Sequence, residues 1–179
     1  MLINNLINAY VKKLNAAGIL NPIEEIRLMI QEILNIDLAT LLLEKNLTIN
    51  YKQEKLIKKC FDRRLKGEPV DRILNKKIFR DFELCLNSST FSPRKETELL
   101  IDIIMNLKIS TNKILELGTG SGAISIALMK TFPKANCVAT DINFASLKLA
   151  KQNAKKNQVL KQINFICCNW LDIFVNFDF

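Results

Sequence analysis

The sequence predicts an α/β protein in which a small helical bundle precedes a parallel sheet. Apolar residues recur at helical spacing over residues 1–66, and from residue 112 onward strand-like and helix-like segments alternate. A short stretch near residue 80 alternates apolar and polar residues between these two regions. The chain has 179 residues, of which 49% are hydrophobic and 25% charged. That mixture excludes a wholly disordered chain and suits one domain or two small ones.

Four helices are predicted over the first 66 residues. Apolar spacing over 2–14 predicts the first, and Asn21-Pro22 start the second as an N-cap followed by a first-turn proline. A capping Asp starts a short segment over 37–43, and a capping Asn starts a helix over 50–66. No nucleophile–base pair occurs here. We therefore expect residues 1–75 to form a domain for recognition or packing rather than chemistry.

The helix over 50–66 is strongly basic, in a chain whose net charge is +8. This charge suits either a solvated helix face or a docking surface for a protein partner. A nucleic-acid face is the less favoured alternative. The cationic residues are Lys52, Lys55, Lys58, Lys59, Arg63, Arg64 and Lys66.

Residues 76–90 are expected to form a β-hairpin linker. Residues 78–80 and 82–86 alternate as two short strands around Arg80-Asp81, and a turn-rich stretch follows. The next helix is expected to turn one apolar set inward: Leu99, Leu100, Ile103, Ile104 and Leu107.

The last third of the chain reads as βαβαβ. Strands are predicted over 113–117, 136–140 and 163–167, with helices over 121–131 and 144–157 between them. This order implies a parallel sheet with right-handed crossovers.

The first strand of this pattern is joined to its helix by Gly118-Thr119-Gly120-Ser121-Gly122. Glycines permit unusual φ values and let a ligand approach the backbone closely. Ligands bind α/β sheets at such a carboxyl edge. The stretch lacks the Gly-Lys-Ser/Thr ending of a Walker loop, and its third glycine comes one residue too early for the dinucleotide fingerprint. It suits a ligand with little need for anion binding, such as the amino-acid portion of S-adenosylmethionine.

Three further side chains are candidates for this ligand. Asp141 ends the second strand, where a carboxylate can accept both ribose hydroxyls of an adenosine or can cap the following helix. Glu116 lies within the first strand, and a nearby sulfonium or amino group would explain a buried carboxylate there. Trp170 can cover an adenine face by stacking, or pack the sheet edge.

Several site classes are not expected. The chain has no His, which removes His-based triads and His zinc sites, and its five Cys form no CxxC pair. We expect no metal site, and cysteines that stay reduced in a cytoplasmic protein. Neither a signal peptide nor a membrane-spanning run is predicted.

With these residues in place, the chain resembles the release factor glutamine methyltransferases, enzymes that methylate the glutamine side-chain amide nitrogen in the Gly-Gly-Gln motif of peptide chain release factors. The segment Pro93-Arg94-x-x-Thr97-Glu98 is quite specific to that family, whereas the glycine loop alone indicates only a class I methyltransferase. The resemblance rests on Gly67–Val70, Arg72–Leu74, Ser92–Arg94 with Thr97-Glu98, Ile114–Ile124, Asp141, Ala150, Asn153-Ala154 and Asn169–Leu171.

The resemblance implies that residues 91–179 form the amino-terminal half of a Rossmann-like S-adenosylmethionine-dependent methyltransferase domain. Residues 118–122, Asp141 and Trp170 would line the donor pocket, and the helical domain at 1–75 would engage the release factor. Such a transfer needs neither metal nor His, because the donor is already activated and catalysis is mainly alignment.

Two departures from the family pattern matter. Asn75 stands where the family usually has a glycine. The family's catalytic Asn-Pro-Pro-Tyr motif is absent from the 179 residues and would follow Phe179, so no catalytic residue is assigned. We therefore expect the chain alone to be inactive, the strand over 114–117 to be an exposed edge, and a complementing polypeptide to be a possible partner. The alternatives are a non-catalytic module that binds release factors and, less favoured, a nucleic-acid methyltransferase.

Overall fold

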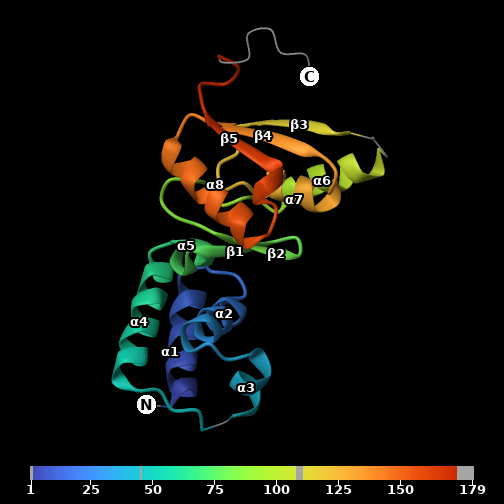
Figure 1. Cartoon of the computed structure of the whole chain (residues 1–179). Coiled ribbons are helices and arrows are strands. Elements are labelled where there is room, and N and C mark those ends of the chain that lie inside the picture. Colours follow the sequence, from blue (N-terminus) through green and yellow to red (C-terminus); the bar gives the residue numbers. More distant parts are fainter. Residues whose placement is uncertain (1, 45, 108–110, 173–179) are drawn as a thin grey trace. The chain divides into compact units, whose positions relative to one another are not determined.

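The computed structural model describes residues 2–44, 46–107 and 111–172. The chain divides into two units, Met1–Leu74 and Asn75–Phe179, and Figure 1 shows the elements of each. None of the helices in the described ranges combines the length and the apolar character that crossing a membrane requires.

The first unit is the predicted helical bundle. Asp37 caps its helix by accepting a hydrogen bond from the Thr40 N–H at 2.7 Å, and Asn50 forms a reciprocal capping box with Gln53. Asn21 precedes the second helix but makes no side-chain cap. The fifth helix was not predicted, because five residues are too few to show a period. The helices are α1 (Ile3–Ala16), α2 (Pro22–Leu34), α3 (Leu38–Leu43), α4 (Tyr51–Leu65) and α5 (Val70–Leu74).

Helix α4 is fixed to its neighbours by one face. Phe61 is fully buried, with its ring centroid 4.8 Å from that of Tyr10 on α1. The Tyr10 hydroxyl donates to Asp62 at 2.8 Å, and burial together with that carboxylate raises the pKa of Tyr10 to about 12. Arg64 pairs with Glu25 of α2, with 2.5 Å between Nε and Oε2. The opposite face of α4 is left toward solvent.

The second unit contains the predicted βαβαβ order, and its three strands form a parallel sheet in the order β3-β4-β5. Leu117 at the end of β3 lies opposite Thr140 of β4, and Asp141 lies opposite Cys167 of β5. The elements are β1 (Lys76–Phe79), β2 (Phe82–Cys85), α6 (Glu96–Asn106), β3 (Lys113–Leu117), α7 (Ala123–Thr131), β4 (Asn136–Asp141), α8 (Phe144–Lys156), the 3-10 turn η1 (Leu160–Gln162) and β5 (Ile163–Cys167).

The hairpin over 76–90 packs more tightly than a linker would. Strands β1 and β2 pair antiparallel, and Phe79, Phe82 and Leu84 are buried in the same core cluster as α7 and the sheet. The hairpin therefore belongs to the core of the second unit, because its alternating pattern supplies one apolar face for burial.

Asn75 has a backbone conformation that glycine adopts readily, which explains why the resembling family usually has a glycine at this position. Its φ is +54°, in the left-handed region, and its C=O accepts a hydrogen bond from the Leu86 N–H at 2.8 Å. Asn tolerates this region better than most side chains do. The turn is thus formed despite the departure from the family pattern.

The predicted orientation of α6 is wrong for most of the expected inward set, of which Ile104 packs against the core. Leu99, Ile103 and Leu107 are 60%, 56% and 61% exposed, whereas Ile101, which was not in the expected inward set, is fully buried. Apolar residues occupy several faces of this helix, so their spacing does not specify which one packs.

One face of the sheet and one edge are open within the described residues. Figure 1 shows α6, α7 and α8 on the same side of the sheet, and no described strand pairs with the outer edge of β3. On the other face, half-buried apolar side chains lie outside the core cluster. They are Leu115, Leu117, Val138 and Ile166.

Candidate functional site

The glycine loop between β3 and α7 has the backbone that only glycine adopts readily. The φ values of Gly118, Gly120 and Gly122 are +75°, +55° and +83°. A Cβ added at Gly118 or Gly120 would meet no heavy atom within 4 Å, so the space beside the loop is open. A Cβ at Gly122 would lie 3.2 Å from that of Ala150, so this third glycine allows close packing on α8.

Asp141 holds the loop at the tip of β4. Its Oδ2 accepts a hydrogen bond from the Gly120 N–H at 2.9 Å, and its Oδ1 accepts one from the Asn143 N–H at 2.8 Å. The Thr119 N–H donates to the Thr140 carbonyl at 2.8 Å, which extends the parallel pairing into the loop. The N-cap of α8 is Asn143, so the alternative interpretation of Asp141 as that cap is wrong.

Glu116 is only 9% exposed, yet its carboxylate has partners within the chain. Its Oε2 accepts hydrogen bonds from the Thr119 hydroxyl at 2.8 Å and from the Ser125 N–H at 3.0 Å. Burial raises the pKa of Glu116 to about 7, against the effect of these donors and with a smaller contribution from the Asp141 charge. Since two donors already satisfy it, its burial does not by itself indicate a ligand.

A hollow of about 440 Å³ lies beside the loop, and we call it the loop hollow. It brings together six of the eight predicted site residues, and Gly122 is not among its lining. The lining offers carboxylates and one guanidinium but neither His nor Cys, which suits binding of a ligand with mixed charges rather than nucleophilic catalysis. The lining residues are Ser89–Arg94, Thr97, Glu116, Gly118–Ser121, Ala123, Ile124, Asp141, Asn143 and Ser146.

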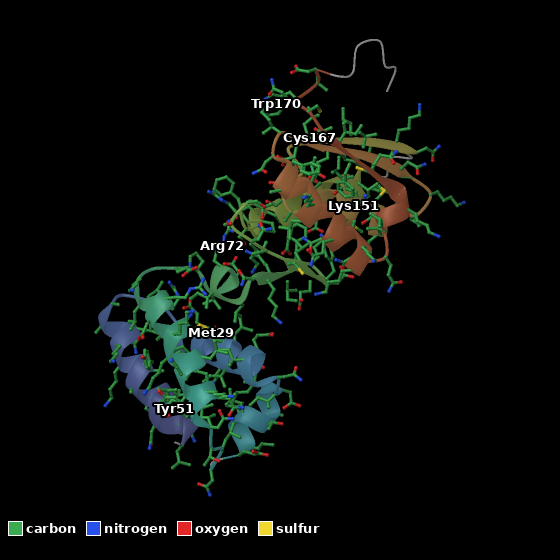
Figure 2. The ribbon with its side chains drawn as sticks, turned by 60° about the vertical axis from the view of Figure 1, so that its left-hand side comes forward. Met29, Tyr51, Arg72, Lys151, Cys167 and Trp170 are labelled. Atoms are coloured by element: carbon green, nitrogen blue, oxygen red, sulfur yellow. The ribbon has the colours of Figure 1, made fainter. Side chains whose placement is uncertain are left out.

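Trp170 lines a smaller adjoining hollow of about 150 Å³, together with Gly118, Asp141 and Ile142. Its side chain, labelled in Figure 2, is 67% exposed. Because Gly118 and Asp141 line both hollows, the two form neighbouring parts of one site. A flat ligand group in the smaller hollow would have an indole ring beside it.

One wall of the loop hollow was not predicted as part of the site. It is the segment Ser89–Arg94, whose Ser89 carbonyl accepts a hydrogen bond from the Ser146 hydroxyl of α8 at 2.9 Å. Its sequence signals were a turn-rich stretch and the Pro-Arg-x-x-Thr-Glu segment. Neither signal reveals, without the fold, that this segment and the glycine loop line the same hollow.

Asn153 was also missed as a support of the site. It is fully buried, and its side-chain amide donates to the carbonyls of Ser121 at 2.9 Å and Cys85 at 3.0 Å. Its Oδ1 accepts from the Cys85 N–H at 2.8 Å. This one side chain joins α8 to the glycine loop and to strand β2.

Comparison with protein families gives two matches. Residues 83–178 match the model described as the methyltransferase small domain. Residues 5–74 match the model described as the PrmC N-terminal domain. The two matches fall on the second and first units, respectively.

Curated relatives are longer than this chain. A release factor glutamine methyltransferase of Agrobacterium fabrum is 33% identical over 167 residues, which cover 90% of this chain and 58% of the relative. A bifunctional methyltransferase of Rickettsia typhi is 33% identical over 190 residues, covering 95% of this chain and 37% of the relative. Among solved structures, a Pyrococcus abyssi tRNA (uracil-54, C5)-methyltransferase in complex with S-adenosyl-L-homocysteine is 22% identical over 52% of this chain and 23% of its own, with a TM-score of 0.44.

Proposed function

The chain belongs to the methyltransferase small domain family, and on that premise we propose that it binds S-adenosylmethionine in the loop hollow and serves in methylating the Gly-Gly-Gln glutamine of peptide chain release factors. The observation that carries this proposal is the geometry of the loop. Gly118 and Gly120 leave open space beside their backbone, and the Asp141 carboxylate is fixed next to them. Both features are what an adenosine-containing ligand needs at the carboxyl edge of a parallel sheet.

The residues present fit the parts of this cofactor. Each oxygen of Asp141 accepts one backbone N–H, and a carboxylate has about four acceptor positions, so capacity remains for the ribose hydroxyls. Trp170 and Ile142 offer apolar surface for adenine in the adjoining hollow. Arg94 lines the loop hollow and suits the ligand's carboxylate, while Glu116 suits its ammonium or sulfonium group.

When bound, S-adenosylmethionine supplies a methyl group that its positive sulfonium has already activated. The chain's own contribution is to hold and orient, which is a recognised source of rate enhancement. The glycine loop admits the ligand close to the backbone, and Asp141 and Trp170 set where its adenosine lies. None of these roles needs a metal or an imidazole.

The helical unit is assigned to the release factor. Its residues 5–74 match the PrmC N-terminal domain, and the Agrobacterium fabrum relative is named for acting on release factors. We place this activity in the cytoplasm, as the family resemblance implies.

A further polypeptide segment is needed for turnover. The chain spans 58% and 37% of the two relatives' lengths, and its 179 residues contain no Asn-Pro-Pro-Tyr. Parallel sheets are normally covered on both faces. The free edge of β3, the exposed side of α6 and the open sheet face are therefore the surfaces on which a segment carrying that motif would dock. Without it, residues 1–179 would at most bind cofactor and release factor.

A labelling assay tests this function. A release factor is incubated with methyl-tritiated S-adenosylmethionine and residues 1–179, with or without the carboxy-terminal segment of the Agrobacterium fabrum relative that lies outside the match. We expect label in the release factor only when both polypeptides are present, and none when its Gly-Gly-Gln glutamine is changed to alanine. Label with residues 1–179 alone would refute the need for the segment. Absence of label under every condition, with both polypeptides folded, would count against the function.

A further inference from the structure

The face of α4 turned away from the bundle core gathers positive charge that the proposed methyl transfer does not use. It borders a surface hollow of about 620 Å³, which we call the α4 hollow. The α4 hollow lies within the first unit and shares no lining residue with the loop hollow. Its eight lining residues comprise five cations (Lys55, Lys58, Lys59, Arg63 and Lys66), the carboxylates Glu54 and Asp62, and Tyr51.

Some charged side chains that line the α4 hollow form ion pairs or hydrogen bonds within the chain, and others do not. Lys58 pairs with Glu54 at 2.6 Å, and Arg63 pairs with Glu68. Asp62 accepts a hydrogen bond from the Tyr10 hydroxyl. The three other lysines of the hollow are exposed and form no ion pair with any residue that the structure describes. They are Lys55, Lys59 and Lys66.

These three lysines depart only in part from an ordinary solvated helix face, because Lys66 stands at i,i+4 from Asp62 whereas Lys55 stands at i,i+4 from Lys59. Such a face alternates opposite charges at i,i+4, which stabilises the helix. Here Lys55 and Lys59 are like charges at that spacing and destabilise it slightly. From Lys55 to Lys66 the positive strip follows about 16 Å of helix axis. An anionic ligand bound along this strip would relieve the repulsion between Lys55 and Lys59.

The hollow also contains an aromatic side chain. Tyr51 begins α4, is 76% exposed, and lines the same hollow as the lysines. Leu56, the exposed apolar residue of this helix, is not part of the lining. Lysine is depleted from protein interfaces, which use apolar anchors at their centre. A phosphate-binding strip with an aromatic ring for a base is instead typical of single-stranded nucleic acid sites.

We propose that the outer face of α4 binds single-stranded RNA, with Lys55, Lys59 and Lys66 on its phosphates and Tyr51 stacked on a base. The first unit then carries a second binding surface besides its release factor role. The attraction is mainly electrostatic, so it is independent of sequence and weakens with salt.

Fluorescence anisotropy with a labelled uridine dodecamer tests the proposal on residues 1–179. We expect binding at about 50 mM salt that weakens steeply toward about 200 mM. A triple Lys55→Gln, Lys59→Gln, Lys66→Gln variant should bind roughly tenfold more weakly and lower the slope of log K against log salt by about 2. The charge-matched control changes the exposed Lys12, Lys151 and Lys155 to Gln, and should bind like the unchanged chain.

Two further measurements separate the possible outcomes. Tyr51→Ala should weaken binding of the dodecamer roughly tenfold, whereas Tyr51→Phe should preserve it, because the ring still stacks. The proposal is overturned if the dodecamer does not bind at low salt, or if the α4 variant and its control bind equally. It is also overturned if a polyglutamate dodecapeptide competes as well as RNA and Tyr51→Ala has no effect, since the surface would then accept an acidic protein.

Discussion

Glu116 shows how a single carboxylate can both support the fold and line the loop hollow. Its hydrogen bonds from Thr119 and Ser125 connect the end of β3 to the loop and to the start of α7. The same burial that makes those bonds strong makes its charge costly. Its protonation should therefore be visible in the stability of the protein.

Stability should fall as the pH rises through the titration of Glu116. The pKa of its carboxyl is about 7 in the folded chain and 4.5 ordinarily, so folding favours the protonated form. The contribution is fully present below about pH 4.5 and is lost as the pH rises to about 7, by up to about 3 kcal/mol. Urea unfolding at a series of pH values measures it.

A matched pair of variants isolates this effect. Glu116→Gln keeps an acceptor for both donors but does not ionise, so its stability should change less with pH than that of the unchanged chain. Glu96→Gln, on an exposed residue of α6, should leave the pH dependence unaltered. Equal curves for the unchanged chain and Glu116→Gln would show that this carboxyl is not the titrating group.

Asn153 makes a second prediction at the residue scale. Asn153→Ala leaves buried backbone groups of Cys85 and Ser121 without their partners, which should cost about 2–4 kcal/mol in the free energy of unfolding. Gln152→Ala, at the exposed neighbouring position of the same helix, should cost less than about 0.5 kcal/mol. Chemical denaturation of both variants compares them directly, and equal losses would mean that the Asn153 network adds little.

At the scale of elements, substitutions in α6 test which face of this helix packs on the core. Ile101→Ala should cost about 2–4 kcal/mol, because Ile101 is fully buried. Ile103→Gln, on the exposed side, should change stability by less than about 0.5 kcal/mol and reduce self-association seen by light scattering. If Ile103→Gln unfolded the protein while Ile101→Ala did not, the orientation of the helix described above would be wrong.

Elements with a local chemical signal could be predicted from the sequence. The caps at Asp37 and Asn50 are set by hydrogen bonds within one helical turn, and the βαβαβ order follows from hydrophobic period. The packed face of α6 could not be predicted, because that choice depends on partners distant in the sequence. The same holds for Asn153, whose partners lie 32 and 68 residues away.

The candidate site also combines residues that a local sequence pattern predicts with residues that only the tertiary fold brings into place. The glycine loop and Asp141 carry a pattern that the sequence displays, and the structure brings them into one hollow. The wall at Ser89–Arg94 comes from a turn whose position is set by Ser146 on α8, so its place in the site is a tertiary feature. The roles of these residues toward a cofactor remain predictions.

At the scale of the whole molecule, the chain combines two units with separate cores and separate surfaces. The second carries the loop hollow together with an open sheet face, and the first carries the basic face of α4. All residues that line the loop hollow and the adjoining hollow, where we propose that the donor binds, lie in the second unit. Cofactor binding should therefore occur in residues 1–179 even where turnover does not.

Titration calorimetry of residues 1–179 with S-adenosylmethionine tests the central claim most directly. We predict saturable binding at one site, weakened at least about tenfold by Asp141→Asn because charged acceptors for the ribose are lost. Asp81→Asn, on an exposed residue of the hairpin turn, should leave the affinity unchanged. No binding heat from a natively folded chain over a range of temperatures, or equal affinity in Asp141→Asn, would contradict the account.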